Sequence, residues 1–255
     1  MLNLTNCRTI YEILKESSPN KNANPVLQYF KEIIGTFSIK DIIIRDSYCF
    51  EATPGHSLVI GNKISIVENF NSYSGTILEI NNNTITMDTP FPVSFTANLK
   101  GNIINTNLAV DASNNRRIFY VDTIKNQDIA ITKAIIHILG SGNKGMDDSK
   151  FGNINKLTKG IIFRKKVGKS IYKNYGNIKS NKDLLLISYY GRYSEKAPTG
   201  YYGFTAMINF YGIENAGVVI RLSNTSYNQQ LELIIQDDLS QLAEFSILVE
   251  GHEVK

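Results

Sequence analysis

GVVIRLSNTSYNQQLELIIQDDLSQLAEFSILVEGHEV, residues 217–254, holds three short apolar runs separated by turn-forming residues. The runs cover residues 218–222, 231–235 and 245–249, and each is bounded by Asn, Ser, Gly or Asp, which commonly reverse a chain. Runs of this length and spacing predict β-strands. The segment also holds no cluster of catalytic residue types, so it favours a protein whose work is to hold or to bind.

The residues before this segment predict a mainly β protein with a helical start. Thr5 is suited to cap a helix that carries Ile10, Ile13 and Leu14 on one face, and residues 26–34 predict a second helix. From residue 38 the pattern changes to short apolar runs, which predict strands at residues 39–44, 57–60, 63–68, 75–80 and 84–87. Strands this short with such brief turns favour a small barrel of SH3-like or OB-like type.

The division into domains rests on one Gly-rich stretch. GSGNKGMDDSKFGNINKLTKG, residues 140–160, has no apolar periodicity and follows further strands expected at residues 101–105, 117–123 and 129–139. We therefore predict four parts: a helical N-terminal segment (1–37), a small β-barrel (38–140), a Gly-rich linker (141–160) and a C-terminal β-sandwich (161–255), for which a jelly roll is a candidate topology.

Composition narrows the class of protein. The 255 residues are 42% hydrophobic and 20% charged, with a net charge of +4, which fits a folded domain and is too weakly basic to favour direct nucleic-acid binding. The two cysteines, Cys7 and Cys49, are too few for a disulfide framework, so we expect free thiols. No signal peptide is expected at the N-terminus, and no run of about 18 apolar residues predicts a membrane span.

The chemical motifs favour no enzyme. The run GSGNKG at residues 140–145 lacks the G-K-[ST] ending of a phosphate loop, and Asp147 and Asp148 lack the spacing of a calcium loop. His56, His137 and His252 have no metal-ligand spacing. We therefore expect no catalytic residue, metal or cofactor, although sequence alone leaves open a two-carboxylate site assembled in three dimensions, as in a polysaccharide-degrading enzyme.

A basic run is the first candidate interaction surface. Ten basic and no acidic residues lie between Lys150 and Lys182, and Arg164, Lys165 and Lys166 form the densest part. The run fits either a solvated face or an electrostatic patch for an acidic partner subunit or an anionic glycan.

A tyrosine-rich segment is the second candidate. SYYGRYSEKAPTGYYGF, residues 188–204, carries Tyr189, Tyr190, Tyr193, Tyr201 and Tyr202. Tyrosine offers a large, stiff contact area with a polar tip, which suits subunit interfaces and sugar platforms. The same residues also suit the core or edge of a sandwich, so both interpretations remain open.

Three segments give the chain a family resemblance. DDSKFGNINKLTKGIIFR (147–164), NIKSNKDLLLISYYGRYSEKAPTGYYGFTAMINFYGIENAGVVIRL (177–222) and LELIIQDDLSQLAEFSILVEGHEV (231–254) are similar to stretches of virion structural proteins of tailed bacteriophages. Residues 55–96 are similar to the upstream part of those proteins. The resemblance covers about residues 50–255 and rests mainly on the K-A-P-x-G-x-x-G-F turn, the G-V-V-I-R-L strand and the closing Q-D-D-L…G-H-x-V.

The resemblance implies a tail or baseplate component, made in the host cytoplasm and located in the virion. Such proteins assemble as rings and dock other tail subunits. The resemblance implies no catalytic residues in this chain. A glycan-binding or receptor-binding module at the tail tip is the alternative. The basic residues and the tyrosines named above are the expected interface residues.

Overall fold

The computed structural model describes residues 25–43, 47–68, 71–91, 95–96, 98–123, 127–140, 147–187, 190–196, 202–209, 220–224 and 228–254. The chain divides into two compact units. One unit is a barrel that spans Lys31–Thr106, and the other is a two-sheet unit that contains most of the remaining described residues. The prediction of a mainly β protein is confirmed.

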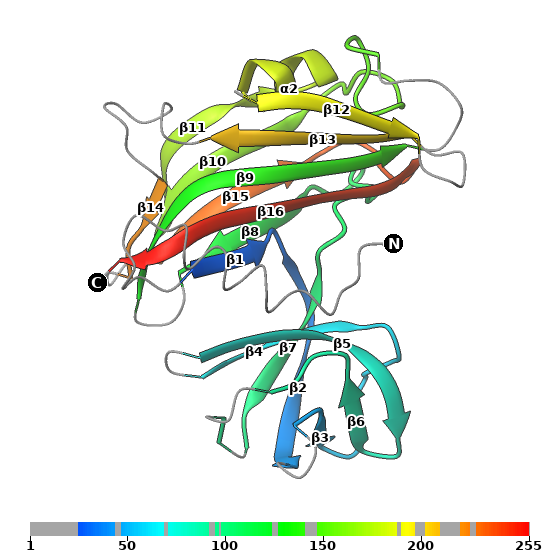
Figure 1. Ribbon diagram of the computed structural model, residues 1–255, viewed down its shortest axis with the longest axis vertical. Helices are drawn as coiled ribbons and strands as arrows, with labels where there is room; N and C mark the ends of the chain where they lie inside the picture. The colour runs from blue at the N-terminus through cyan, green and yellow to red at the C-terminus, as the bar shows by residue number, and fades with distance from the viewer. Residues whose placement is uncertain are drawn as a thin grey trace. The chain divides into compact units, whose positions relative to one another are not determined.

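Six strands close the barrel in the order β2-β3-β6-β5-β4-β7, and Figure 1 shows them in colours that run from blue (β2) to green (β7). Their bounds are β2 Glu32–Ile43, β3 Cys49–Ala52, β4 Lys63–Glu68, β5 Asn71–Asn81, β6 Thr84–Met87 and β7 Lys100–Asn105. Closure leaves no sheet edge, because every strand of the barrel pairs on both sides.

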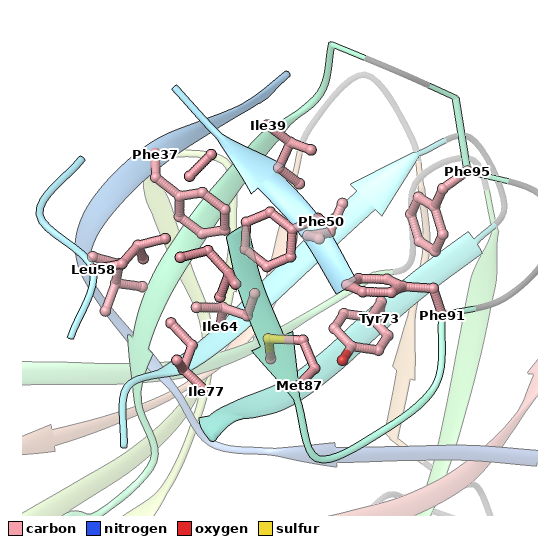
Figure 2. Close-up of a cluster of buried hydrophobic side chains, with 14 residues drawn as sticks. Phe37, Ile39, Phe50, Leu58, Ile64, Tyr73, Ile77, Met87, Phe91 and Phe95 are labelled. Atoms are coloured by element: carbon pink, nitrogen blue, oxygen red, sulfur yellow. The ribbon is translucent and has the colours of Figure 1, made fainter. Parts of the chain in front are cut away.

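Aromatic rings fill the barrel (Figure 2). Phe50, which is fully buried, stacks on Phe37 at 5.6 Å between ring centroids and meets the edge of Phe91 at 5.9 Å. Tyr73 stacks on Phe91 at 4.2 Å and donates its hydroxyl to the carbonyl of Thr89 at 2.7 Å. The buried phenol is thus satisfied inside an apolar core, as a polar group at such depth requires.

The second unit has two sheets (Figure 1). The larger sheet has the order β1-β16-β9-β13-β12, with β14 also paired to β9, and the smaller has the order β11-β10-β15-β8. The bounds are β1 Pro25–Tyr29, β8 Arg117–Asp122, β9 Asp128–Gly140, β10 Ile161–Val167, β11 Ser170–Ile178, β12 Tyr190–Lys196, β13 Tyr202–Asn209, β14 Ile220–Leu222, β15 Gln229–Ile235 and β16 Leu242–Val254. A short helix, α2 (Asn181–Ile187), follows β11.

Each sheet of this unit contributes buried apolar residues from one face. In β9, Ile136 and Ile138 are buried while Ile135 and His137, which alternate with them, are half-exposed. Phe163 of the smaller sheet is buried too, and its ring lies 6.0 Å from that of Phe30, which follows β1 of the larger sheet. Alternation of this kind is what a sheet with one buried face produces, and it is compatible with the predicted sandwich.

The predicted boundary between the units is wrong. Chain segments on both sides of the barrel, β1 before it and β8 and β9 after it, belong to the two-sheet unit, so the barrel is an insertion that ends at Thr106 and not at residue 140. Residues 147–160 are not a linker, because Phe151 is fully buried in the two-sheet unit and meets Phe245 edge-on at 5.5 Å. The predicted boundary failed because strand periodicity does not reveal which distant strand will be the partner.

The predicted helix at residues 26–34 is also wrong. This segment forms β1 and the first residues of β2. Pairing with β16 buries Val26 and places Phe30 in the core, while Leu27 and Tyr29 stay exposed, so the segment follows a period of two. The helix predicted around Thr5 lies outside the described residues. The strand predicted at residues 57–60 is instead a loop that ends in a turn, with Gly61 at a φ of 86°.

Replacing Gly101 by alanine should destabilise the barrel. A Cβ at this position would lie 2.2 Å from the Phe37 ring, which is buried and stacked, so the ring or the strand must shift. We expect a loss of about 1–3 kcal/mol, typical of overpacking. Gly35→Ala in the same strand pair is the matched control, because its nearest neighbour is the flexible end of Ile103 at 3.2 Å. Urea unfolding followed by circular dichroism measures both, and equal stabilities of the two variants would contradict the expectation.

Tyr73 should make the barrel sensitive to alkali. Burial, and then the nearby Asp88 carboxylate, raise the pKa of Tyr73 above its ordinary value of 10. The neutral phenol therefore stabilises the fold fully below pH 10, and this contribution is lost as the pH rises above 10 towards the raised pKa. Tyr73→Phe should cost about 1 kcal/mol at neutral pH, through the lost hydrogen bond, yet lose less stability than the wild type between pH 9 and pH 11. Parallel losses in the two proteins would show that Tyr73 does not carry the effect.

Candidate interaction surfaces

The three basic residues predicted as an interface lie on β10 of the smaller sheet, but two of them are held in an ion cluster. Arg164 and Lys166 project from the same face of the strand and contact the carboxylate of Glu232 on β15 at 2.9 Å and 3.3 Å. The Glu232 side chain is only 3% exposed. Both cations therefore compensate a buried charge, which is a structural task.

Lys165 faces the opposite side of β10 and is buried. Its amine donates a hydrogen bond of 2.6 Å to the carbonyl of Arg221 in β14, a strand that pairs with β9 of the larger sheet. Lys165 thus links the two sheets and is not part of an exposed patch. Strand alternation separates it from Arg164 and Lys166, its neighbours in sequence.

Tyr120 lies beside the ion cluster on β8, as the register partner of Glu232. Burial, and then the Asp122 carboxylate, raise the pKa of Tyr120 to about 12. The phenol therefore stays neutral at any physiological pH, and the charge of Glu232 is compensated by the two cations on β10.

The predicted tyrosines belong to the larger sheet. Tyr190 and Tyr193 lie in β12, opposite Met207 and Thr205 of β13, and Tyr202 opens β13. Tyr189 and Tyr201 lie outside the described residues. The eight predicted interface residues thus do not gather on one sheet, since the basic group belongs to the smaller sheet and the described tyrosines to the larger.

An apolar row crosses the outer face of the larger sheet. Tyr29 of β1 lies opposite Leu248 of β16, which lies opposite Ile135 of β9, so three neighbouring strands place apolar residues in one line. Tyr29 is exposed, and Leu248 and Ile135 are half-exposed. The register continues from Ile135 to Met207 in β13.

Polar residues flank this apolar row on both sides. On one side, Lys133 of β9 pairs with Glu250 of β16 at 2.5 Å between nitrogen and oxygen. On the other, His137 lies 3.3 Å from the hydroxyl of Thr205. An apolar strip between polar margins is the usual anatomy of a contact surface.

The barrel carries a second exposed apolar surface, the apolar turn, formed by Val59, Ile60 and Leu78. These side chains are 58%, 64% and 56% exposed. Two backbone hydrogen bonds of 2.9 Å fix the turn against β5. The Gly61 amide donates to the Ile77 carbonyl, and the Ile77 amide donates to the Asn62 carbonyl. These bonds hold the backbone next to Ile60 against the backbone next to Leu78, so the turn that carries the exposed side chains is fixed.

Sequence reasoning missed the apolar turn because it assigned residues 57–60 to a strand. The available signal was the order Val59-Ile60-Gly61-Asn62, in which two β-branched residues directly precede a turn pair. A strand would need a ladder partner for these residues. Here the Val59 amide donates to the Asn62 side-chain oxygen at 3.0 Å, and the Val59 carbonyl accepts from the Asn62 amide at 3.1 Å, so both of these bonds stay within the turn.

Asp147, which the sequence placed near a calcium-loop pattern, and Asp237, in a similar Asp-Asp pair, have local structural tasks. Asp237 accepts hydrogen bonds from the backbone amides of Thr158, Lys159 and Gly160, and Asp147 accepts from Ser149. Within the part of the chain that the structure describes, no group of three or more His, Cys, Asp or Glu could hold a metal ion. Among the same residues, no helix has the length and apolar character to cross a membrane.

Comparisons of the chain with protein-family models, with curated proteins and with solved structures found no match.

Glu232→Gln should destabilise the two-sheet unit. The substitution keeps the shape of the side chain but removes the charge that Arg164 and Lys166 contact. We expect a loss of about 1–3 kcal/mol, as for hydrogen bonds to charged groups. The matched control is Glu244→Gln, because the Glu244 side chain is 48% exposed and the change should stay within about 0.5 kcal/mol. Thermal unfolding at constant pH compares the midpoints of the two variants with that of the wild type. An unchanged midpoint for Glu232→Gln would show that the ion cluster does not contribute to stability.

Proposed function

We propose that the chain is a structural subunit of a tailed-bacteriophage virion, located in the tail or baseplate. It associates with copies of itself, as in a ring, and docks other tail subunits. The observation that carries the proposal is the apolar turn of the barrel, in which Ile60 and Leu78 are more than half exposed on a backbone fixed by hydrogen bonds.

The energetics of this surface favour a protein partner. Full burial of each side chain against a partner contributes about 1.5–3 kcal/mol. Because hydrogen bonds already fix the backbone of the turn, docking would cost little conformational entropy in this segment. A subunit that must wait for its neighbours needs such a surface, exposed before assembly and covered after it.

The assignment to a phage virion rests on the family resemblance of the sequence. Its most specific parts fall at the end of β12 and the start of β13, in β14, and from the end of β15 through β16, strands that build both sheets of the two-sheet unit. In this proposal the closed barrel is of SH3-like or OB-like type, and the two sheets form a β-sandwich of jelly-roll type. The protein is made in the host cytoplasm, needs no cofactor and performs no reaction.

Charged substitutions in the apolar turn should block assembly. We expect Ile60→Asp and Leu78→Asp to fold normally, because both side chains are exposed, and to reduce incorporation into virions at least about tenfold, which corresponds to about 1.4 kcal/mol per contact. Ile171→Asp is the matched control, since Ile171 is 59% exposed on β11 of the other unit. Mass spectrometry of purified particles from complemented phage measures the incorporated amount.

Two results would contradict the proposal. Absence of the wild-type chain from the particles would remove the virion assignment, and normal incorporation of both barrel variants would remove the apolar turn from the interface. Specific retention of a glycan by the purified protein, lost in Tyr202→Ala, would instead support the alternative of a glycan-binding module at the tail tip, with β12 and β13 as its platform.

A further inference from the structure

The chain segments that lead into and out of the barrel are both bound to β16. The entering segment is β1, which lies beside β16 (Figure 1), and the residue after it, Phe30, donates its amide to the Ile247 carbonyl at 2.9 Å. The leaving segment begins at Asn107, and the Leu108 amide donates to the Phe245 carbonyl at 2.6 Å. Phe30 and Leu108 are fully buried, so both segments contribute to the core of the two-sheet unit.

Asn107 binds the leaving segment to β16 a second time, through its side chain. Its side-chain oxygen accepts hydrogen bonds from the Phe245 amide at 3.2 Å and from the Ala109 amide at 3.0 Å. The amide and the carbonyl of Phe245 are therefore both bonded to the leaving segment. The carbonyls that receive the two segments, those of Phe245 and Ile247, are two residues apart, which is about 7 Å along the strand.

The barrel brings the same two segments together at its own end. It spans Lys31–Thr106, and one residue inward Glu32 of β2 lies opposite Asn105 of β7. Such register partners in an antiparallel ladder lie about 5 Å apart. The Thr106 hydroxyl also accepts a hydrogen bond of 3.0 Å from the Lys63 amine of β4. The closed barrel therefore holds its two ends at nearly the spacing at which β16 binds the two segments.

An unfolded barrel would leave about 75 residues of open chain between the two segments. The pairing of Glu32 with Asn105 shortens this path to about four residues, because the path then crosses from β2 to β7 at that pair. The probability that the ends of a loop meet falls as about the −3/2 power of its length. The shortening therefore raises the effective concentration of β1 at β16 about 80-fold.

We propose that the closed barrel is a clamp that holds β1 and the Leu108 segment on β16. It acts as a cross-link between residues 32 and 105 would act, by lowering the entropy cost of binding both segments side by side. The stability of this part of the larger sheet thus depends on the folding of the barrel. The clamp operates in the free chain, whether or not the chain is a virion subunit.

Hydrogen exchange of the full-length protein, measured by mass spectrometry, tests the clamp. Phe50→Asp places a charge in the barrel core, where Phe50 is fully buried, and should unfold the barrel. The amides of β1 and of the Leu108 segment should then exchange about 80-fold faster. Leu78→Asp is the matched control, because the same charge at an exposed position of the barrel should leave these rates unchanged. Unchanged β1 rates in Phe50→Asp, with the barrel amides unprotected, would overturn the proposal.

A disulfide that replaces the clamp provides a second measurement. In a Cys7→Ser, Cys49→Ser background that carries Phe50→Asp, the pair Glu32→Cys and Asn105→Cys has the separation that a disulfide needs. Oxidation should slow the exchange of β1 at least about tenfold while the barrel amides stay unprotected, and reduction should reverse the effect. If Phe50→Asp also exposes the amides of β15, oxidation should restore their protection too. Exchange that oxidation leaves unchanged would overturn the proposal.

Discussion

The pairing of β9 with β16 is the interaction on which the two-sheet unit depends. β16 covers nearly the whole of β9 on one side, and β13 and β14 share the other side in succession. At Gly251 the two strands leave no room for a side chain, because a Cβ there would lie 2.1 Å from the carbonyl oxygen of Ala130. With β9 fixed in this way, its buried side chains define the core and its half-exposed ones define the outer surface of the sheet.

The ion cluster and the inter-sheet link show how a strand divides a charged run. Arg164, Lys165 and Lys166 are consecutive, yet the first and last contact Glu232 and the middle one reaches Arg221 across the core. The predicted basic patch assumed that consecutive basic residues share one surface. In a strand, side chains two apart share a face and adjacent ones do not. The net positive charge of the segment therefore says little about how much of it a partner could meet.

The local sequence pattern predicted a strand well where turn-forming residues mark both of its ends. The strand at residues 84–87 was predicted with its observed bounds, because Asn-rich turn residues precede it and Asp88 follows. Residues 26–34 fit both a helical and an alternating pattern, and β16, almost a chain length away, selected the second. Partner choice also decided the domain boundary, since β8 pairs with β15 and β9 with β16. The apolar turn escaped notice because its hydrophobic residues imitate a strand.

The insertion of the barrel between β1 and β8 has a consequence for synthesis on the ribosome. All six barrel strands lie between Lys31 and Thr106, so this unit has every partner it needs once that stretch has emerged. β1 emerges earlier still, but its only partner among the described strands is β16, which ends at Val254. β1 must therefore wait for β16, and a chain released before β16 is made would hold a closed barrel while β1 and one side of β9 lack their strand partner.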